Sequence, residues 1–250
     1  MITAICQIAM HWTIEENVEN ITKWIKECAE KGVELAIFPE CALTGYHRKM
    51  PKITNSQALQ NAFQKIAECV KENNIYTIIG APYIDSDTPN NVFNSALFFS
   101  PKTKKYELTS KNGLTNVETL YFTKGEKRTI FEIEGFKVGV IFCIEVNDKE
   151  DVLADFKDAD LDLLTWISYI KWDDNSIPEN SINYQNSLDI SNALNVPIIN
   201  VNWANALNDP TLKGMGGSRY IKDGKIQFKL PEDTETLELI KVEILEAKAV

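Results

Sequence analysis

Two residues that can take part in covalent catalysis stand at the ends of apolar segments. Cys143 ends the run VGVIFC, and Glu40 follows VELAIF and Pro39. A thiol just past a buried strand can be presented to a cleft, with backbone N–H groups nearby to stabilise an oxyanion. A carboxylate shielded at a strand end has a raised pKa and becomes a useful proton acceptor.

Each candidate also has a plain structural explanation. Taken alone, Cys143 is more often a small buried apolar residue, and Glu40 is as readily a solvated loop carboxylate. Lys111 follows the segment KYELT and stands seven positions before Glu118. Most lysines are exposed, and nothing in its immediate neighbourhood singles Lys111 out.

Metal or cofactor chemistry is not indicated by the sequence. The chain has two histidines, His11 and His47, in no metal-ligand spacing, and its five cysteines include no C-x-x-C pair. We therefore expect reduced thiols, no metal and no cofactor. A cysteine–histidine hydrolase stays open as an alternative, although it would need one of these histidines beside Cys143.

Composition and charge restrict the class of protein. The 250 residues are 44% hydrophobic and 25% charged, which predicts one globular domain over residues 1–250. A net charge of −10 disfavours nucleic acid and anionic membranes as partners. The first apolar run, ITAICQIAM, lacks a basic start and a cleavage site, so we expect a strand there and a cytoplasmic protein.

Helices and strands alternate along the chain. Thr13 and Glu16 form a capping-box pattern, and apolar residues then recur at helical spacing until Gly32. A second helix is expected around residues 59–70 and a third, weakly patterned, over 180–195. Strands are expected at residues 2–9, 33–38, 75–83, 94–100, 105–109, 161–169, 198–203 and 237–245. Residues 129–143 are expected to form two strands joined at Glu134-Gly135, and a hairpin turn is expected at Asp223-Gly224. This order suggests mixed sheets covered by helices on their outer faces.

Three motifs together resemble the carbon–nitrogen hydrolase (nitrilase) superfamily in content, order and spacing. They are FPECALTGY, KNGLTNVETLYFTKG and VGVIFCIE, and the similarity extends through DLLTWISYIKW, IINVNW and GGSRYIKDGKI. The resemblance implies an α/β fold, a four-layer α-β-β-α sandwich of two mixed sheets flanked by helices. It also implies a homodimer or a higher homo-oligomer.

The resemblance assigns a role to each candidate. Cys143 would attack a small amide as the nucleophile, and Glu40 would carry the proton. Lys111, with the backbone N–H of Ile144, would stabilise the oxyanion, and its charge would favour the thiolate. Glu118 would orient Lys111 and the substrate amide.

Further positions follow from the same resemblance. Glu145 would make a supporting hydrogen bond. Aromatic residues would build the pocket wall, although they could equally belong to the core: Tyr46, Trp166, Tyr169, Trp172 and Trp203.

The chain also departs from the family's patterns. The cysteine is followed by IEVNDKED instead of a Y-D-x-R-F-P-E string, and SNALN at 191–195 keeps only Asn195 of an R-A-x-E-N helix motif. These departures affect fold detail and subunit contacts more than chemistry. With only three arginines, Arg48, Arg128 and Arg219, recognition of a substrate carboxylate cannot be assumed.

The leading hypothesis is therefore an amidase that converts a small amide to a carboxylic acid and ammonia through a cysteine thioester. A nitrilase and an N-carbamoyl hydrolase are alternatives within the same family. A catalytically silent scaffold or binding protein is an alternative of a different class.

Overall fold

Two mixed β-sheets form the centre of the molecule. The structure, a computed structural model, describes residues 1–47, 49–103, 105–171 and 181–243. Within these residues, the first six-stranded sheet has the order β14 (Thr236–Lys241), β1 (Ile2–Gln7), β3 (Leu35–Ile37), β4 (Tyr76–Ile84), β5 (Val92–Phe99) and β6 (Tyr106–Ser110). The second has the order β13 (Lys225–Lys229), β12 (Arg219–Lys222), β10 (Ile198–Val201), β9 (Leu163–Ile167), β8 (Phe136–Phe142) and β7 (Phe131–Ile133). A small separate sheet pairs β2 (Ala9–Met10) with β11 (Asn205–Ala206).

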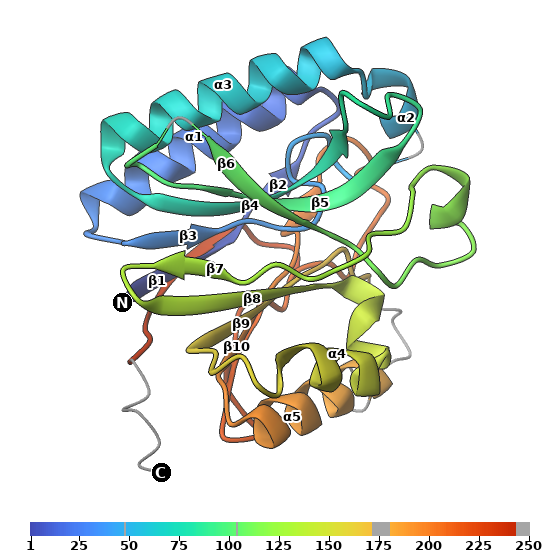
Figure 1. The fold of residues 1–250 in the computed structure, drawn as a ribbon. Coiled ribbons are helices and arrows are strands. Elements are labelled where there is room, and N and C mark those ends of the chain that lie inside the picture. Colours follow the sequence, from blue (N-terminus) through green and yellow to red (C-terminus); the bar gives the residue numbers. More distant parts are fainter. Residues whose placement is uncertain (48, 104, 172–180, 244–250) are drawn as a thin grey trace.

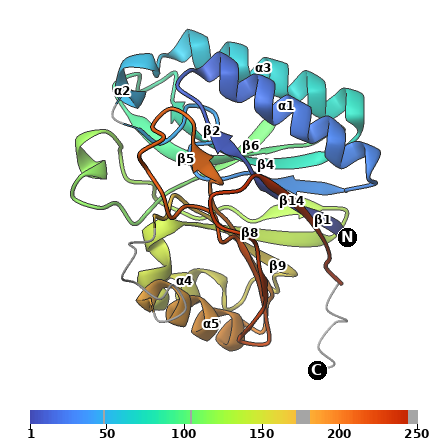
Figure 2. The ribbon, with the colours of Figure 1, turned by 180° about the vertical axis from the view of Figure 1, so that it is seen from behind.

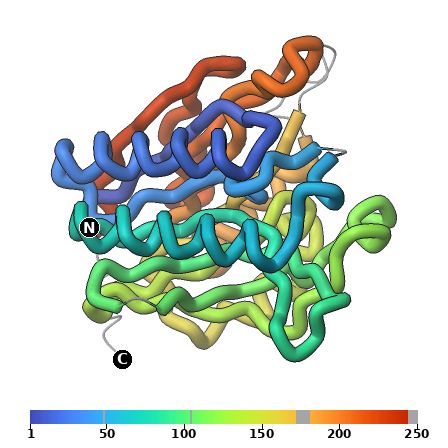
Figure 3. Tube along the Cα trace, turned by 90° about the horizontal axis from the view of Figure 1, so that it is seen from above, coloured from blue at the N-terminus to red at the C-terminus, as the bar shows by residue number. Residues whose placement is uncertain are grey.

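Helices cover the outer faces of both large sheets. The α-helices of the described chain are α1 (Ile14–Glu30), α2 (Met50–Ile53), α3 (Ser56–Asn73), α4 (Lys149–Phe156) and α5 (Ile182–Leu194). Figures 1 and 2 show α1 and α3 over the first sheet, and α4 and α5 over the second. Seen from above, α1 and α3 lie side by side across the first sheet (Figure 3). The predicted four-layer α-β-β-α sandwich is confirmed.

Three apolar layers hold the four structural layers together. The first contains Ile21 and Ile25 of α1 and Phe63 and Ile66 of α3, packed against one face of the first sheet. The second lies between the sheets and the third between the second sheet and its helices. Because side chains alternate between the two faces of a strand, a strand buried on both faces reads as a continuous apolar run.

Local sequence explains where the long helices begin and end. Thr13 caps α1 with both bonds of a capping box, since its hydroxyl accepts from the Glu16 N–H and the Glu16 side chain accepts from the Thr13 N–H. The Asn55 side chain accepts from the Ala58 N–H and caps α3. Asn195 ends α5 in the left-handed conformation, with a φ of 51°.

Most of the expected elements are present, with shorter or divided strands at several places. The strand expected over residues 2–9 ends at Gln7, and the chain resumes pairing in the separate β2. Helices α2 and α4 were not expected: α2 is a single turn, and α4 is short and buries only Val152 and Phe156. No helix in the described ranges is long and apolar enough to cross a lipid bilayer.

Strand direction brings distant chain segments to one edge of the sandwich. β3 is parallel to β4, and two antiparallel pairings through β5 give β6 the same direction. In the second sheet β8, β9 and β10 are parallel to one another. The segments that follow β3, β6, β8 and β9 therefore leave the sheets where open α/β architectures place their sites.

Candidate active site

Lys111 lies between two carboxylates in a buried ion-pair network. Its Nζ is 2.8 Å from Oε1 of Glu40 and 2.6 Å from Oε1 of Glu118. Lys111 and Glu40 are each 1% exposed, and Glu118 is 3% exposed. Since Glu40 follows β3 and Lys111 follows β6, the network joins two separate strand ends of the first sheet.

Glu40 is fixed on both carboxylate oxygens. Asn94 Nδ2 donates to Oε1 at 2.8 Å, and the backbone N–H of Tyr169 donates to Oε2 at 3.1 Å. Burial raises the pKa of Glu40, and the nearby charge of Lys111 offsets only part of that effect. The carboxylate is therefore both held in place and more basic than that of a free glutamate.

Cys143 stands at a sharp turn between β8 and the short 3₁₀-helix η2 (Cys143–Asn147). Its φ is 27°, a positive value that non-glycine residues seldom adopt and that is often found at functional sites. Its Sγ donates a hydrogen bond to the carbonyl oxygen of Tyr169 at 3.3 Å. Because the N–H of Tyr169 binds Glu40, one residue's backbone contacts both the thiol and the carboxylate.

The thiol is protonated at neutral pH. Burial, together with the negative charge of Glu40, raises the pKa of Cys143 to about 12, although Lys111 acts in the opposite direction. Lys111 by itself lowers the pKa of Cys143 and favours the thiolate, but burial and the charge of Glu40 outweigh its effect. Attack by the sulfur therefore requires a base to take the proton.

Burial and attraction act in opposite directions on the other two charged groups. Burial favours the neutral amine, but attraction to Glu40, Cys143 and Glu118 outweighs it and raises the pKa of Lys111. Burial likewise favours the neutral acid at Glu118, but the charge and hydrogen bond of Lys111 lower its pKa. Lys111 therefore remains a cation beside a charged Glu118.

Glu118 is held in place by three donors. Besides Lys111, the Tyr46 hydroxyl donates to its Oε1 at 3.0 Å and the Thr115 N–H to its Oε2 at 2.9 Å. Glu118 begins η1 (Glu118–Leu120), a single 3₁₀ turn. Glu118 is therefore fixed on both oxygens and accepts a hydrogen bond from Lys111.

Glu145 ties the turn of Cys143 to the segment that follows Lys111. Its Oε1 accepts the N–H groups of Asn112 and Gly113 at 2.6 and 2.9 Å, and its Oε2 accepts the N–H of Phe142 at 2.9 Å. Arg128 lies 3.3 Å from the same Oε1 and also pairs with Asp155 of α4. The carboxylate is fully buried. Four groups therefore contact the Glu145 carboxylate, three backbone N–H groups and one guanidinium.

The tryptophans proposed for the pocket wall lie behind the site. Trp166 and Trp203 are both fully buried. Trp166 Nε1 donates to the carbonyl oxygen of Cys143, and Trp203 Nε1 donates to that of Glu40, each at 2.9 Å. They therefore fix the backbone of the two site residues from within the core. Trp172 lies outside the described residues.

An open pocket of about 660 Å³ adjoins the ion-pair network. Tyr46, Glu118 and Tyr169, each of which is hydrogen-bonded within the network described above, form part of its wall. The remaining lining residues are Met10, Trp12, His47, Met50, Pro51, Val117, Tyr121, Phe122, Asn208, Asp209 and Leu212. This volume suits a small organic molecule.

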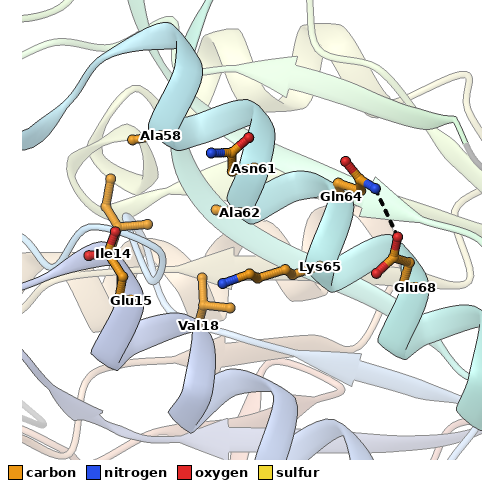
Figure 4. A pocket seen from close by; sticks show the side chains of 9 residues that line it. All are labelled: Ile14, Glu15, Val18, Ala58, Asn61, Ala62, Gln64, Lys65 and Glu68. Atoms are coloured by element: carbon orange, nitrogen blue, oxygen red, sulfur yellow. Dashed lines mark hydrogen bonds between the residues drawn. The ribbon is translucent and has the colours of Figure 1, made fainter.

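A smaller hollow, of about 340 Å³, lies on the outer helical layer. Figure 4 shows it between α1 and α3, bordered by Ile14 and Val18 on one helix and Lys65 on the other. It contains none of the residues of the ion-pair network and no cysteine. Of these two hollows, the larger is therefore the one that Glu118 of the ion-pair network lines.

Sequence reasoning missed several residues that shape the site. Gly80 of β4 is one, because a Cβ there would lie 2.3 Å from the Pro39 carbonyl oxygen and 2.7 Å from the Glu40 Cα. Asn94 and Arg128 are others, since their partners are 54 and 17 positions away in the chain. Only the placement of Gly80 in an apolar strand gave a signal, because such a glycine often marks a close backbone approach.

Comparisons with known proteins identify the family of this chain and several relatives. The sequence model of the family described as "Carbon-nitrogen hydrolase" matches residues 2–247. Nitrilase homolog 2 of Dictyostelium discoideum is 27% identical over 146 residues, which cover 54% of this chain and 44% of that protein. A glutamine-dependent NAD(+) synthetase of Acinetobacter baylyi is 24% identical over 243 residues, covering 94% of this chain and 42% of that protein. The chain thus matches less than half the length of these two relatives.

Solved structures share the fold at lower identity. An amidase of the nitrilase superfamily from Nesterenkonia AN1 superposes with a TM-score of 0.80 at 16% identity, covering 96% of this chain and 89% of that one. The glutamine-dependent NAD+ synthetase of Acinetobacter baumannii gives 0.80 at 21% identity, covering 95% and 44%. Because the family match extends over nearly the whole sequence, the chain belongs to the carbon–nitrogen hydrolase family.

Proposed function

We propose that this protein hydrolyses a small primary amide to a carboxylic acid and ammonia, with Cys143 as nucleophile. One observation carries the proposal: the buried network of Glu40, Lys111 and Glu118 adjoins an open pocket, and the Tyr169 backbone connects it to the Cys143 thiol. The network supplies a base and a cation, and Cys143, which shares the Tyr169 backbone with Glu40, supplies the nucleophile that acyl transfer requires.

The first half of the reaction forms a thioester. Glu40 takes the proton from Cys143 as the sulfur attacks the amide carbon, and a tetrahedral oxyanion results. The Lys111 ammonium stabilises that oxygen, together with the N–H of Ile144, which lies in the first turn of η2 where backbone donors have no partner within the helix. Glu40 then gives its proton to the nitrogen, the carbon–nitrogen bond breaks, and ammonia leaves.

The second half releases the acid. Glu40 takes a proton from a water molecule, and the water oxygen attacks the thioester carbon. The carbon–sulfur bond breaks, the sulfur regains a proton, and the carboxylic acid departs. Throughout both halves Glu118 keeps Lys111 in place, because the lysine is hydrogen-bonded to it at 2.6 Å.

Some relatives are named for amide chemistry and others are named nitrilases. The omega-amidase of Xenopus tropicalis is 24% identical over 144 residues. A structure of the Nesterenkonia AN1 amidase shows the Michael addition of acrylamide at its active site cysteine. The names of these two proteins describe an amide substrate and an active site cysteine, and both fit the proposed reaction.

An ammonia-release screen tests the proposal. Aliphatic and aromatic amides, ω-amides, carbamoyl compounds and nitriles are incubated with the protein, and the products are identified. We expect ammonia and a carboxylic acid from amides, with no carbon dioxide. Cys143→Ala should abolish turnover. Cys69→Ala changes a residue of α3, the helix on the outer face of the first sheet, and should leave turnover intact. Unchanged ammonia release by Cys143→Ala would refute the assignment of the nucleophile.

The remaining sequence-based expectations stay predictions. They are the single domain over residues 1–250, the cytoplasmic location and the homodimer or higher homo-oligomer.

A further inference from the structure

The pocket beside the ion-pair network has mostly aromatic and aliphatic walls. Tyr46 and Tyr169 stack at the inner end, with ring centroids 4.8 Å apart and an interplanar angle of 15°. Tyr121, Phe122 and Leu212 add further apolar surface. Stacked aromatic walls bind flat or branched apolar groups well, because such groups bury a large area on entering.

The charged residues of the pocket are acidic. Glu118 and Asp209 line it, and no lysine or arginine is among the described lining residues. His47 adds no positive charge near neutral pH, because burial lowers its pKa. Lys49 lies near the mouth, but its ammonium sits over the Trp12 ring, 4.1 Å from the centroid. A substrate carboxylate would enter close to these two negative charges, and none of the described lining residues is a lysine or arginine that could pair with it.

The two arginines that the structure describes are committed elsewhere. Arg128 pairs with Glu145 and Asp155. Arg219 is fully buried, and its guanidinium lies 3.4 Å from the centroid of the Tyr184 ring. Neither lines the pocket. Arg48 lies outside the described residues.

The mouth of the pocket continues the apolar wall. Val117, Tyr121 and Trp12 line it while remaining 65%, 46% and 38% exposed. Exposed apolar residues that border a cavity commonly mark the surface that a ligand covers. The apolar surface thus extends from the buried network to solvent along one wall.

From these features we infer that the preferred substrate is an uncharged amide whose acyl chain carries an aromatic or bulky aliphatic group. The inference rests on the proposed amide hydrolysis and deepens it by naming the substrate class. The amide end reaches Cys143 and Lys111, while the apolar group lies against Tyr46, Tyr169 and the residues toward the mouth. Amides that bear a free carboxylate are poorer substrates, because Glu118 and Asp209 line the same pocket.

A matched pair of substrates tests the inference. Phenylpropionamide and succinamate share the same two-carbon chain and amide, and differ in carrying a phenyl ring or a carboxylate at the far end. We expect kcat/KM for phenylpropionamide to exceed that for succinamate by at least about tenfold. Equal or faster turnover of succinamate overturns the inference while leaving amide hydrolysis in place. Ammonia release from no amide at all overturns the proposed function, and the inference with it.

Two exposed positions in one turn provide a further test. Val117 lines the pocket, whereas Leu120, which is 74% exposed, does not. Val117→Arg should shift the ratio of kcat/KM toward succinamate by about tenfold, because it adds a positive charge to the lining of the mouth. Leu120→Arg, which adds the same charge three positions away, should leave the ratio unchanged. The same shift in both variants would show that the pocket wall does not select the substrate.

Discussion

The thiol of Cys143 donates its hydrogen bond to the backbone of Tyr169, 3.3 Å away, and not to the carboxylate of Glu40. The resting sulfur is thus a protonated thiol whose pKa is raised to about 12, chiefly by burial and then by the charge of Glu40. Glu40 consequently has two opposed effects on the sulfur. It opposes the free thiolate at rest, and it accepts the proton when substrate is attacked.

These opposed effects predict opposite outcomes for one substitution. Glu40→Gln removes the negative charge that raises the pKa of Cys143, so alkylation by iodoacetamide at pH 9 should become faster. The same change removes the base, so amide hydrolysis should fall by about 10²- to 10⁴-fold. Peptide mapping identifies the labelled cysteine, and ammonia release measures turnover. Slower alkylation of the variant would show that the charge of Glu40 does not suppress the thiolate.

Selectivity of labelling follows from accessibility. Cys143 is partly exposed, whereas Cys6, Cys28, Cys41 and Cys69 are buried. We expect iodoacetamide to modify Cys143 first in the folded protein, at a rate that keeps rising with pH beyond 9. Equal labelling of all five residues would contradict the placement of the thiol. Labelling in urea serves as the control, because unfolding should make the five cysteines react alike.

The pH dependence of catalysis follows from the direction of two pKa shifts. Glu40 accepts a proton only when ionised, and its pKa is raised above the ordinary value of 4.5. The acid limb of kcat/KM should therefore have its midpoint above pH 4.5, with activity lost as the pH falls through it. Lys111 has a pKa raised above 10.5, so its titration should cause no loss of activity below that pH. A midpoint below 4.5 in a pH–rate profile would exclude Glu40, with this raised pKa, as the base.

The buried cation also stabilises the fold. Lys111→Met leaves Glu40 and Glu118 buried without their partner, which should lower the free energy of unfolding at pH 7 by about 3–5 kcal/mol. Adding Glu118→Gln should recover part of the loss, since one unpaired carboxylate is removed. Urea unfolding measures both variants. Lys102→Met, which breaks only the exposed pair with Glu134, should have little effect and serves as the control.

The parts of the site that the sequence predicts are those with a local signal. Glu40 and Cys143 stand at the ends of apolar runs, whereas Lys111 is identified only by the string KNGLTNVETLYFTKG, which resembles that of the family. The capping box of Thr13 and Glu16 likewise lies within four consecutive residues and is confirmed. Such features are set by neighbours along the chain, so spacing is enough to find them.

Contacts between segments that are distant in the sequence have no such local signal. Trp166 was as well explained by the pocket wall as by the core, because its indole partner, the Cys143 carbonyl, is 23 positions away. Arg128 stands in a charged stretch that suggests exposure, yet it is 6% exposed and pairs with Glu145. The spacing of a sequence does not say which buried cation meets which buried carboxylate, because that depends on how the two sheets pack.

Gly80 of β4 lies against the segment of residues 39–41, which follows β3 and contains Glu40. A methyl group there meets backbone atoms of Pro39, Glu40 and Cys41 at 2.3 to 2.7 Å, and backbone cannot rotate away. Gly80→Ala should therefore displace Glu40, cost about 1–3 kcal/mol of stability and lower kcat/KM. Gly139→Ala is the control, since its Cβ would meet the ends of Leu and Phe side chains that can shift. That variant should keep its activity, and equal losses in both would mean that Gly80 acts only through stability.

The Arg128–Glu145 pair lies where the segment after Lys111 meets the segment that carries Cys143. Glu145 binds backbone N–H groups on both sides, next to Cys143 and after Lys111, and Arg128 is the cation at its Oε1. Arg128→Met leaves that carboxylate without its cation, so both stability and kcat should fall. Asp155→Asn removes the more exposed partner of Arg128 and should leave both close to those of the unmodified protein, because its side chain is 42% exposed. Urea unfolding and ammonia release compare the two variants. Arg128→Met could instead lose stability but keep its kcat. That result would show that the backbone donors alone hold Glu145 in position. Arg128 would then stabilise the fold without aligning Lys111 with Cys143.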